Sequence, residues 1–88
     1  MKLVVEEKLE KPFPNLASVA LPEGADLLKV EIRDGHFVLW ALCDQDEPLY
    51  PRTVEIYKTG EPIPKHAFQH ISTFSDGTET YHAFERYF

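Results

Sequence analysis

The sequence predicts an all-β domain, either a small antiparallel β-sandwich or a partly open barrel of six to seven short strands. Apolar or alternating runs, rich in Val, Ile, Leu and aromatic residues, are separated by turn residues roughly every 8–12 positions. Two Asp-Gly steps, at Asp34-Gly35 and Asp76-Gly77, are each flanked by such runs. No long segment keeps a helical period, and the length of 88 residues suits a single domain, which we place at 1–88.

The N-terminal part is expected to contribute two short strands. Residues 2–9 carry apolar side chains followed by charged ones, which favours an edge strand. The segment 11–15 contains two prolines and interrupts the sheet, because proline has no backbone N–H to donate. Residues 16–21 resume as a strand, and residues 22–24 form a turn.

A β-hairpin at 27–44 is the predicted centre of the core. Its Asp-Gly step tolerates the positive φ angles of a type I′ turn, and this turn sets the register of the two strands. In this register Arg33 faces His36 next to the turn, and Leu28 faces Ala41 at the far end of the hairpin. Side chains alternate with period two, so one face is expected to be core. That face consists of Leu28, Val30, Ile32, Phe37, Leu39 and Ala41.

The second strand of this hairpin is apolar on both sides. This pattern is typical of a central strand that a further layer or another subunit covers. The face opposite the core, centred on Trp40, and the acidic loop after it are therefore the candidate partner surface. Its residues are Lys29, Glu31, Val38, Trp40 and Leu42 on the strands and Asp44, Asp46 and Glu47 in the loop.

Three further elements complete the predicted fold. Residues 44–51 are polar, acidic and bracketed by prolines, as expected of an exposed loop. Residues 52–58 alternate as a strand, and the prolines after it favour an extended connection. A second hairpin is expected from 68–74 and 78–87.

Motifs for catalysis or cofactor binding are missing from the sequence. The four glycines stand singly at turns, so no glycine-rich phosphate loop is present. Ser72, Ser75 and Cys43 lack the local signature of an activated nucleophile. We therefore expect neither enzymatic activity nor a cofactor.

Three histidines are candidate metal ligands. His66 and His70 are four residues apart, and His82 could approach from a neighbouring strand. In the predicted register, however, His82 lies opposite Ile71, beside His70 rather than on its face. The prolines before His66 also leave little room for a helix, so we expect no metal site.

The charge balance argues against nucleic acid as a partner. The formal net charge is −6, whereas binding to a phosphate backbone needs clustered Lys and Arg. An acidic surface is compatible with a basic protein partner. The single cysteine excludes an internal disulfide, and no stretch approaches the roughly 20 apolar residues that span a bilayer. We therefore expect a soluble cytoplasmic protein that binds no membrane.

Four sequence blocks, in order, resemble those of a known family. They are LWALCD at 39–44, RTVEIYKTGEPI at 52–63, HISTF at 70–74 and YHAFE at 81–85. The family comprises short proteins of unknown function encoded in tailed bacteriophages, prophages and some bacterial genomes, and the resemblance covers about residues 19–86. It implies a β fold and a phage or mobile-element origin, and it implies no activity. The chain departs from the family pattern at Cys43, Lys58, Glu61 and Ser72.

The sequence therefore favours a non-enzymatic accessory protein of phage or prophage type that binds a host or phage protein in the cytoplasm of the host cell. The alternative is a structural, virion-associated role, in which the chain self-associates into a homodimer or a larger assembly.

Overall fold

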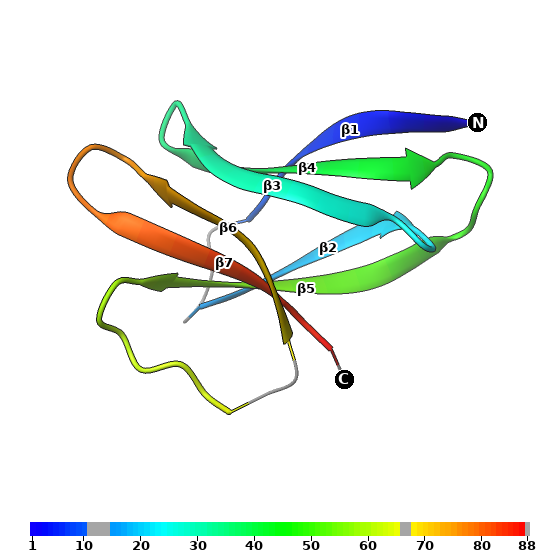
Figure 1. The fold of residues 1–88 in the computed structure, drawn as a ribbon. Coiled ribbons are helices and arrows are strands. Elements are labelled where there is room, and N and C mark those ends of the chain that lie inside the picture. Colours follow the sequence, from blue (N-terminus) through cyan, green and yellow to red (C-terminus); the bar gives the residue numbers. More distant parts are fainter. Residues whose placement is uncertain (11–14, 66–67, 88) are drawn as a thin grey trace.

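The computed structural model describes residues 1–10, 15–65 and 68–87 (Figure 1). It confirms the predicted all-β class. None of the described residues forms a helix, so that part of the chain has no helix long and apolar enough to cross a membrane. The seven strands are β1 (Lys2–Lys8), β2 (Leu16–Pro22), β3 (Asp26–Arg33), β4 (His36–Asp44), β5 (Leu49–Lys58), β6 (Phe68–Ser75) and β7 (Thr80–Arg86).

The strands form two antiparallel sheets. The three-stranded sheet has the order β1-β4-β3, and the four-stranded sheet has the order β2-β5-β7-β6. The two sheets pack face to face, and β3 of one lies beside β6 of the other (Figure 1). The sheets are not closed into a barrel, so the fold is the sandwich-like form of the two predicted architectures.

The core lies between the two inner faces and consists mostly of small side chains. An aromatic cluster closes one end, where the ring of Phe37 meets those of Phe74 and Tyr81 edge-to-face, with centroids 6.0 and 5.5 Å apart. The buried cluster comprises Leu9, Ala17, Leu21, Ala25, Val30, Leu39, Ala41, Cys43, Val54, Ile56 and Ala83.

Ser72 joins the two sheets where β6 meets β3. Its Oγ accepts a hydrogen bond from the Val30 N–H (2.9 Å) and donates one to the Val30 carbonyl (2.8 Å). The register of β6 against β7 shifts between His70 and Ser72, so Ile71 is an extra residue. This bulge turns Ser72 to the inner face, opposite Ala83. One hydroxyl thus satisfies both backbone groups of Val30 at the edge of its sheet.

The predicted register of the first hairpin is correct near the turn and wrong at its far end. Arg33 pairs with His36 as expected, and Asp34 has the positive φ of 52° that the turn requires. A bulge between Leu27 and Lys29 then shifts the register, so Ala41 pairs with Leu27 rather than Leu28. Leu28 is consequently 48% exposed and is not a core residue.

The predicted loop at 44–51 is shorter in the structure. Strand β5 begins at Leu49 and includes Pro51, which lies opposite Ala20 of β2. The Ile56 N–H donates to the Asn15 carbonyl, and hydrogen-bonded pairs alternate along an antiparallel ladder. The odd-numbered residues of β2 therefore direct their N–H and carbonyl groups toward β5, whereas Ala20 directs its own away from β5. The nitrogen of Pro51 therefore faces away from β2. On that side β7 ends at Arg86, opposite Thr53, so the proline removes no ladder bond.

We predict that Ser72→Ala lowers the free energy of unfolding by about 1–3 kcal/mol, because the N–H and the carbonyl of Val30 lose their partner at a half-buried position. Urea denaturation measures this change. Ser18→Ala, at an exposed serine of β2, is the matched control. Equal stability of the two variants would contradict the role assigned to Ser72.

Candidate interaction surface

The candidate surface is the outer face of the three-stranded sheet, the side turned away from the four-stranded sheet. The register places the predicted residues together there, since Lys29 lies opposite Trp40 and Glu31 lies opposite Val38. Strand β1 adds Glu6 opposite Trp40, and it adds a residue that sequence reasoning missed, Val4 opposite Leu42. No strand of the described part of the chain packs on this face. The outer face therefore carries Val38, which is only 5% exposed, and the more exposed side chains of Lys2, Val4, Glu6, Lys8, Asp26, Lys29, Glu31, Arg33, Trp40, Leu42 and Asp44.

Charged side chains hold Trp40 in place at one end of the outer face. The indole Nε1–H donates to Glu31 Oε1 (3.1 Å), and the Arg33 guanidinium lies 5.2 Å from the centre of the ring. Arg33 also pairs with Glu6 (3.1 Å), and Lys29 pairs with Glu31 (3.0 Å). Hydrogen bonds from Lys29 and then from Trp40 lower the pKa of Glu31.

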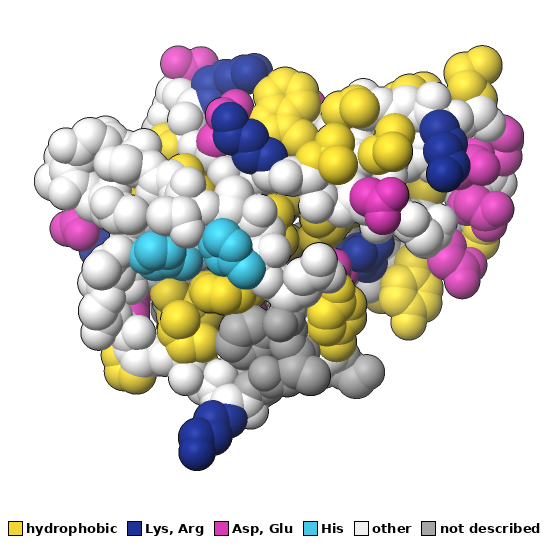
Figure 2. Space-filling view, in the orientation of Figure 1, with side chains coloured by type: hydrophobic (Ala, Val, Ile, Leu, Met, Phe, Trp, Pro, Cys, Tyr) yellow, Lys and Arg dark blue, Asp and Glu magenta, His cyan; other side chains and the backbone are white. Residues whose placement is uncertain are grey.

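The other end of the outer face carries two apolar side chains, with Asp26 opposite Leu42 and the pair Lys2 and Asp44 beside them. Val4 is 54% exposed on β1, and its neighbour Leu42 is partly exposed on β4. Hydrophobic side chains gather beside basic ones over β1, β4 and β3, at the top of Figure 2. The face therefore combines an ordered tryptophan with an apolar patch that water contacts.

The acidic part of the predicted surface begins at the end of β4. Asp44 lies opposite Lys2 and thus on the outer face, whereas Asp46 and Glu47 are exposed in the turn after it. The Met1 ammonium donates to Asp44 (3.1 Å) and Asp46 (2.7 Å). The pKa of Asp44 is lowered, first by the backbone N–H of Asp46 and then by the ammonium. Glu47 follows in the same turn and adds a further exposed carboxylate.

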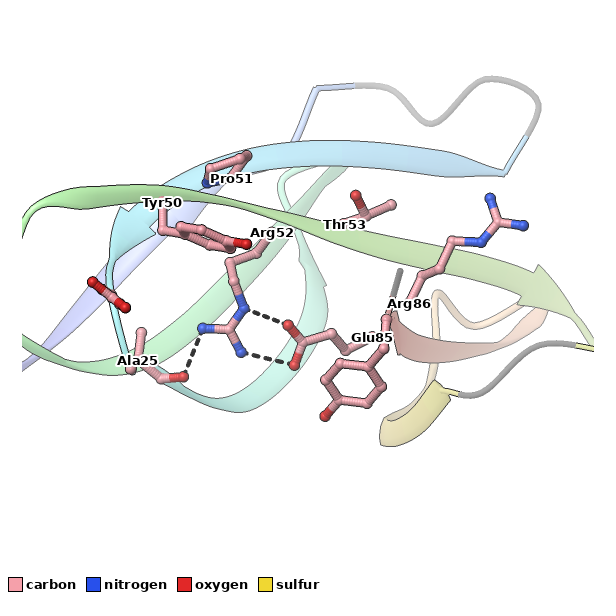
Figure 3. A pocket seen from close by; sticks show the side chains of 10 residues that line it. Ala25, Tyr50, Pro51, Arg52, Thr53, Glu85 and Arg86 are labelled. Atoms are coloured by element: carbon pink, nitrogen blue, oxygen red, sulfur yellow. Dashed lines mark hydrogen bonds and ion pairs between the residues drawn. The ribbon is translucent and has the colours of Figure 1, made fainter.

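A pocket of about 540 Å³ lies between the β2–β3 turn, β5 and the end of β7 (Figure 3). Its centre is Arg52, which forms a bidentate ion pair with Glu85 and donates through Nη1 to the Ala25 carbonyl (2.8 Å). Glu85 raises the pKa of Arg52. Tyr50 and Tyr87 flank the pocket and are about half exposed.

The charges in this pocket already satisfy one another. The side chains of Arg52 and Glu85 are 17% and 7% exposed, and their hydrogen bonds fix the β2–β3 turn to the four-stranded sheet. The sequence carried a signal for this pair, because Arg52 and Glu85 stand on the core-facing sides of their strands with Val54 and Ala83. We conclude that the ion pair of Arg52 and Glu85 stabilises the fold. The pocket is therefore a weaker candidate for a binding site than the outer face.

The four-stranded sheet buries a second carboxylate, on the face turned away from the core. Glu55 is 1% exposed and accepts a hydrogen bond from the Tyr57 hydroxyl (3.1 Å), and Arg86 Nε lies 3.6 Å from the same oxygen. Burial, and then the hydrogen bond to Glu55, raises the pKa of Tyr57. The strand pattern at 52–58 correctly predicted that both residues face away from Val54 and Ile56, and it did not reveal their burial.

The predicted register around the histidines was wrong. Strand β6 ends at Ser75, opposite Thr80, so the connection 76–79 has four residues instead of the expected two-residue Asp-Gly turn, and His82 lies opposite Thr73. The bulge at Ile71 then puts His70 opposite Phe84, so His70 and His82 share one face of the sheet. Thr73 Oγ1 bridges them, 3.0 Å from His70 Nε2 and 3.0 Å from His82 Nδ1. His66 lies outside the described residues. Within those residues no three His, Cys, Asp or Glu side chains are grouped so that they could hold a metal ion.

Cys43 is buried beneath the three-stranded sheet. Burial raises the pKa of its thiol, which disfavours the reactive thiolate.

A family model described as a domain of unknown function (DUF7352) matches residues 7–88. No curated protein and no solved structure matches the chain.

We predict that Glu85→Ala lowers the free energy of unfolding by about 3 kcal/mol, because it leaves the charge of Arg52 largely buried without its partner. The double variant Arg52→Met/Glu85→Leu should regain most of this loss, since no unpaired charge remains. Urea denaturation compares both with Glu79→Ala, at an exposed position. A double variant less stable than Glu85→Ala would contradict this account.

Proposed function

Because the chain belongs to the DUF7352 family of domains of unknown function, which supplies no activity, we propose from its structure that it acts by binding a protein. The binding surface is the outer face of the three-stranded sheet. The observation that carries this proposal is the apolar character of β4 on the side that no described strand covers.

The arrangement of Trp40 supports binding of a protein. Large aromatic residues contribute strongly to protein interfaces when they are held in place before binding. Glu31 and Arg33 fix the indole on two sides and are themselves paired with Lys29 and Glu6. A partner can therefore bury the ring without supplying new counter-charges at this end of the face.

The charges around the outer face indicate the chemistry of the partner. Two exposed carboxylates border the apolar patch of Val4 and Leu42: Asp26 lies opposite Leu42, and Glu47 lies in the turn beyond Asp44 and Asp46, which share the Met1 ammonium. The net charge of the chain is −6. The complementary surface is an apolar patch bordered by Lys or Arg. We propose that the protein originates from a phage or prophage and that this partner is a host or phage protein in the cytoplasm, on the strength of the sequence blocks between 39 and 85.

Affinity capture with two matched variants tests this function. Leu42→Asp places a charge in the apolar patch, whereas Tyr87→Asp places one at the more exposed rim of the Arg52 pocket, the other candidate site. We expect one protein to be captured from host extract by the wild type and by Tyr87→Asp, and to be lost from Leu42→Asp. With the purified partner, Leu42→Asp should weaken binding by about tenfold or more, as expected for a charge buried in an apolar contact.

Circular dichroism and urea denaturation should show that Leu42→Asp retains the fold, because its side chain lies on the solvent side of β4. A partner that binds Leu42→Asp as tightly as the wild type would contradict the proposal. So would repeated capture experiments that recover no specific protein.

A further inference from the structure

We infer that two copies of the chain associate through the free edge of β1, with their β1 strands antiparallel and centred on Val4. This inference goes beyond the proposed function, because it uses a strand edge rather than the outer face and names a second copy of this chain as the occupant.

Within the described part of the chain, the backbone of β1 is paired along one of its two edges. Strand β1 hydrogen bonds to β4 and to no other described strand. The Leu9 N–H donates to the Phe37 carbonyl, and the Met1 carbonyl accepts from the Gln45 N–H, so the odd-numbered residues face β4. The even-numbered residues therefore direct their N–H and carbonyl groups away from the sheet. These are Lys2, Val4, Glu6 and Lys8, and all four are exposed.

The side chains of β1 select one register for a second copy. When the pairing is centred on Val4, the two Val4 residues face each other, and Lys2 of each copy faces Glu6 of the other. Leu3 then faces Val5 on the other side of the sheet. All pairs from residue 2 to residue 6 are either apolar or of opposite charge, as stable cross-strand pairs require.

Neighbouring registers lose this complementarity. Centring on Val5 places Lys2 opposite Lys8 and Val4 opposite Glu6. Centring on Leu3 places Lys2 opposite Val4 and removes both ion pairs. Of these three registers, charge complementarity therefore favours the one centred on Val4.

The pairing also covers exposed apolar side chains. Leu3 and Val4 are 38% and 54% exposed in the single chain, although both are apolar residues of a strand. The edge of β3, in contrast, is joined to β6 through Ser72. The free edge of β2 carries no charged side chain that could set a register, and it ends at Pro22. Among the described strands, β1 thus has the edge best suited to self-association.

The dimer would contain a continuous six-stranded sheet with the order β3-β4-β1-β1-β4-β3, built from the observed order of each copy. The two outer faces would then lie side by side on one surface, with Trp40 of both copies still uncovered. Because only one strand per copy is paired, the interface is small and the dissociation constant is expected in the micromolar range.

Sedimentation equilibrium between about 1 and 500 µM, a range that spans the affinity expected for a small interface, tests the inference. The wild type should shift with concentration from the 10.2 kDa monomer to twice that mass. Val4→Lys places two like charges opposite each other and should raise the dissociation constant by about tenfold or more. Lys8→Glu lies outside the paired residues and should leave the dimer unchanged.

A charge exchange tests the register itself. Lys2→Glu alone and Glu6→Lys alone should each be monomeric, because like charges then face each other. An equimolar mixture of the two should form a heterodimer, since every facing pair regains opposite charges. Hydrogen exchange of the wild type should show protected amides at Lys2, Val4 and Glu6 at high concentration only.

A wild type that remains monomeric at the highest concentration would overturn the inference. So would a dimer that Val4→Lys leaves intact, or a mixture of the two charge variants that stays monomeric. If Val4→Lys fails to fold, the charge exchange decides the question. Loss of the dimer leaves the Leu42→Asp comparison unaffected, so this inference and the proposed function fail separately.

Discussion

Strand β4 is apolar on both sides, while the described residues provide one further sheet to cover it. The four-stranded sheet covers the inner side, where Leu39, Ala41 and Cys43 are buried. On the outer side the chain supplies single side chains instead of a layer. Arg33 and Glu31 shield part of Trp40, and Leu42 beside Val4 remains accessible to water. The outer face thus follows from how few strands a chain of 88 residues can form.

Two sets of polar contacts, in addition to the small core, hold the two sheets together. Ser72 joins the edges of β3 and β6 through Val30, and Arg52 with Glu85 fixes the β2–β3 turn at the end of the sandwich. Both contacts direct polar side chains inward from strands whose other inward residues are apolar. Each contact satisfies its own donors and acceptors, which is why neither is our first candidate for a ligand site.

Most of the fold could be predicted from local patterns, and its departures have local causes. The step Asp34-Gly35 gave the correct turn, and alternation gave the correct faces for β5 and β7. The bulges at Leu28 and Ile71 were missed, because one extra residue leaves the composition of a strand unchanged while it reverses the faces beyond it. The burial of Glu55 was also missed, since it depends on packing that strand alternation does not encode. The predicted partner residues Lys29 and Glu31 share the face of Trp40, because both lie between the bulge and the hairpin turn, where the register is as predicted.

The solvent accessibility of Trp40, the single tryptophan of the chain, shows whether the outer face is the binding surface. Acrylamide quenching of its fluorescence should show an indole that solvent reaches in the free protein, to the same extent at low and at high protein concentration. Quenching should fall when the captured partner is added. An indole already shielded in the free monomer, or one that stays equally accessible in the complex, would contradict the claim that the outer face is the surface on which this protein binds its partner.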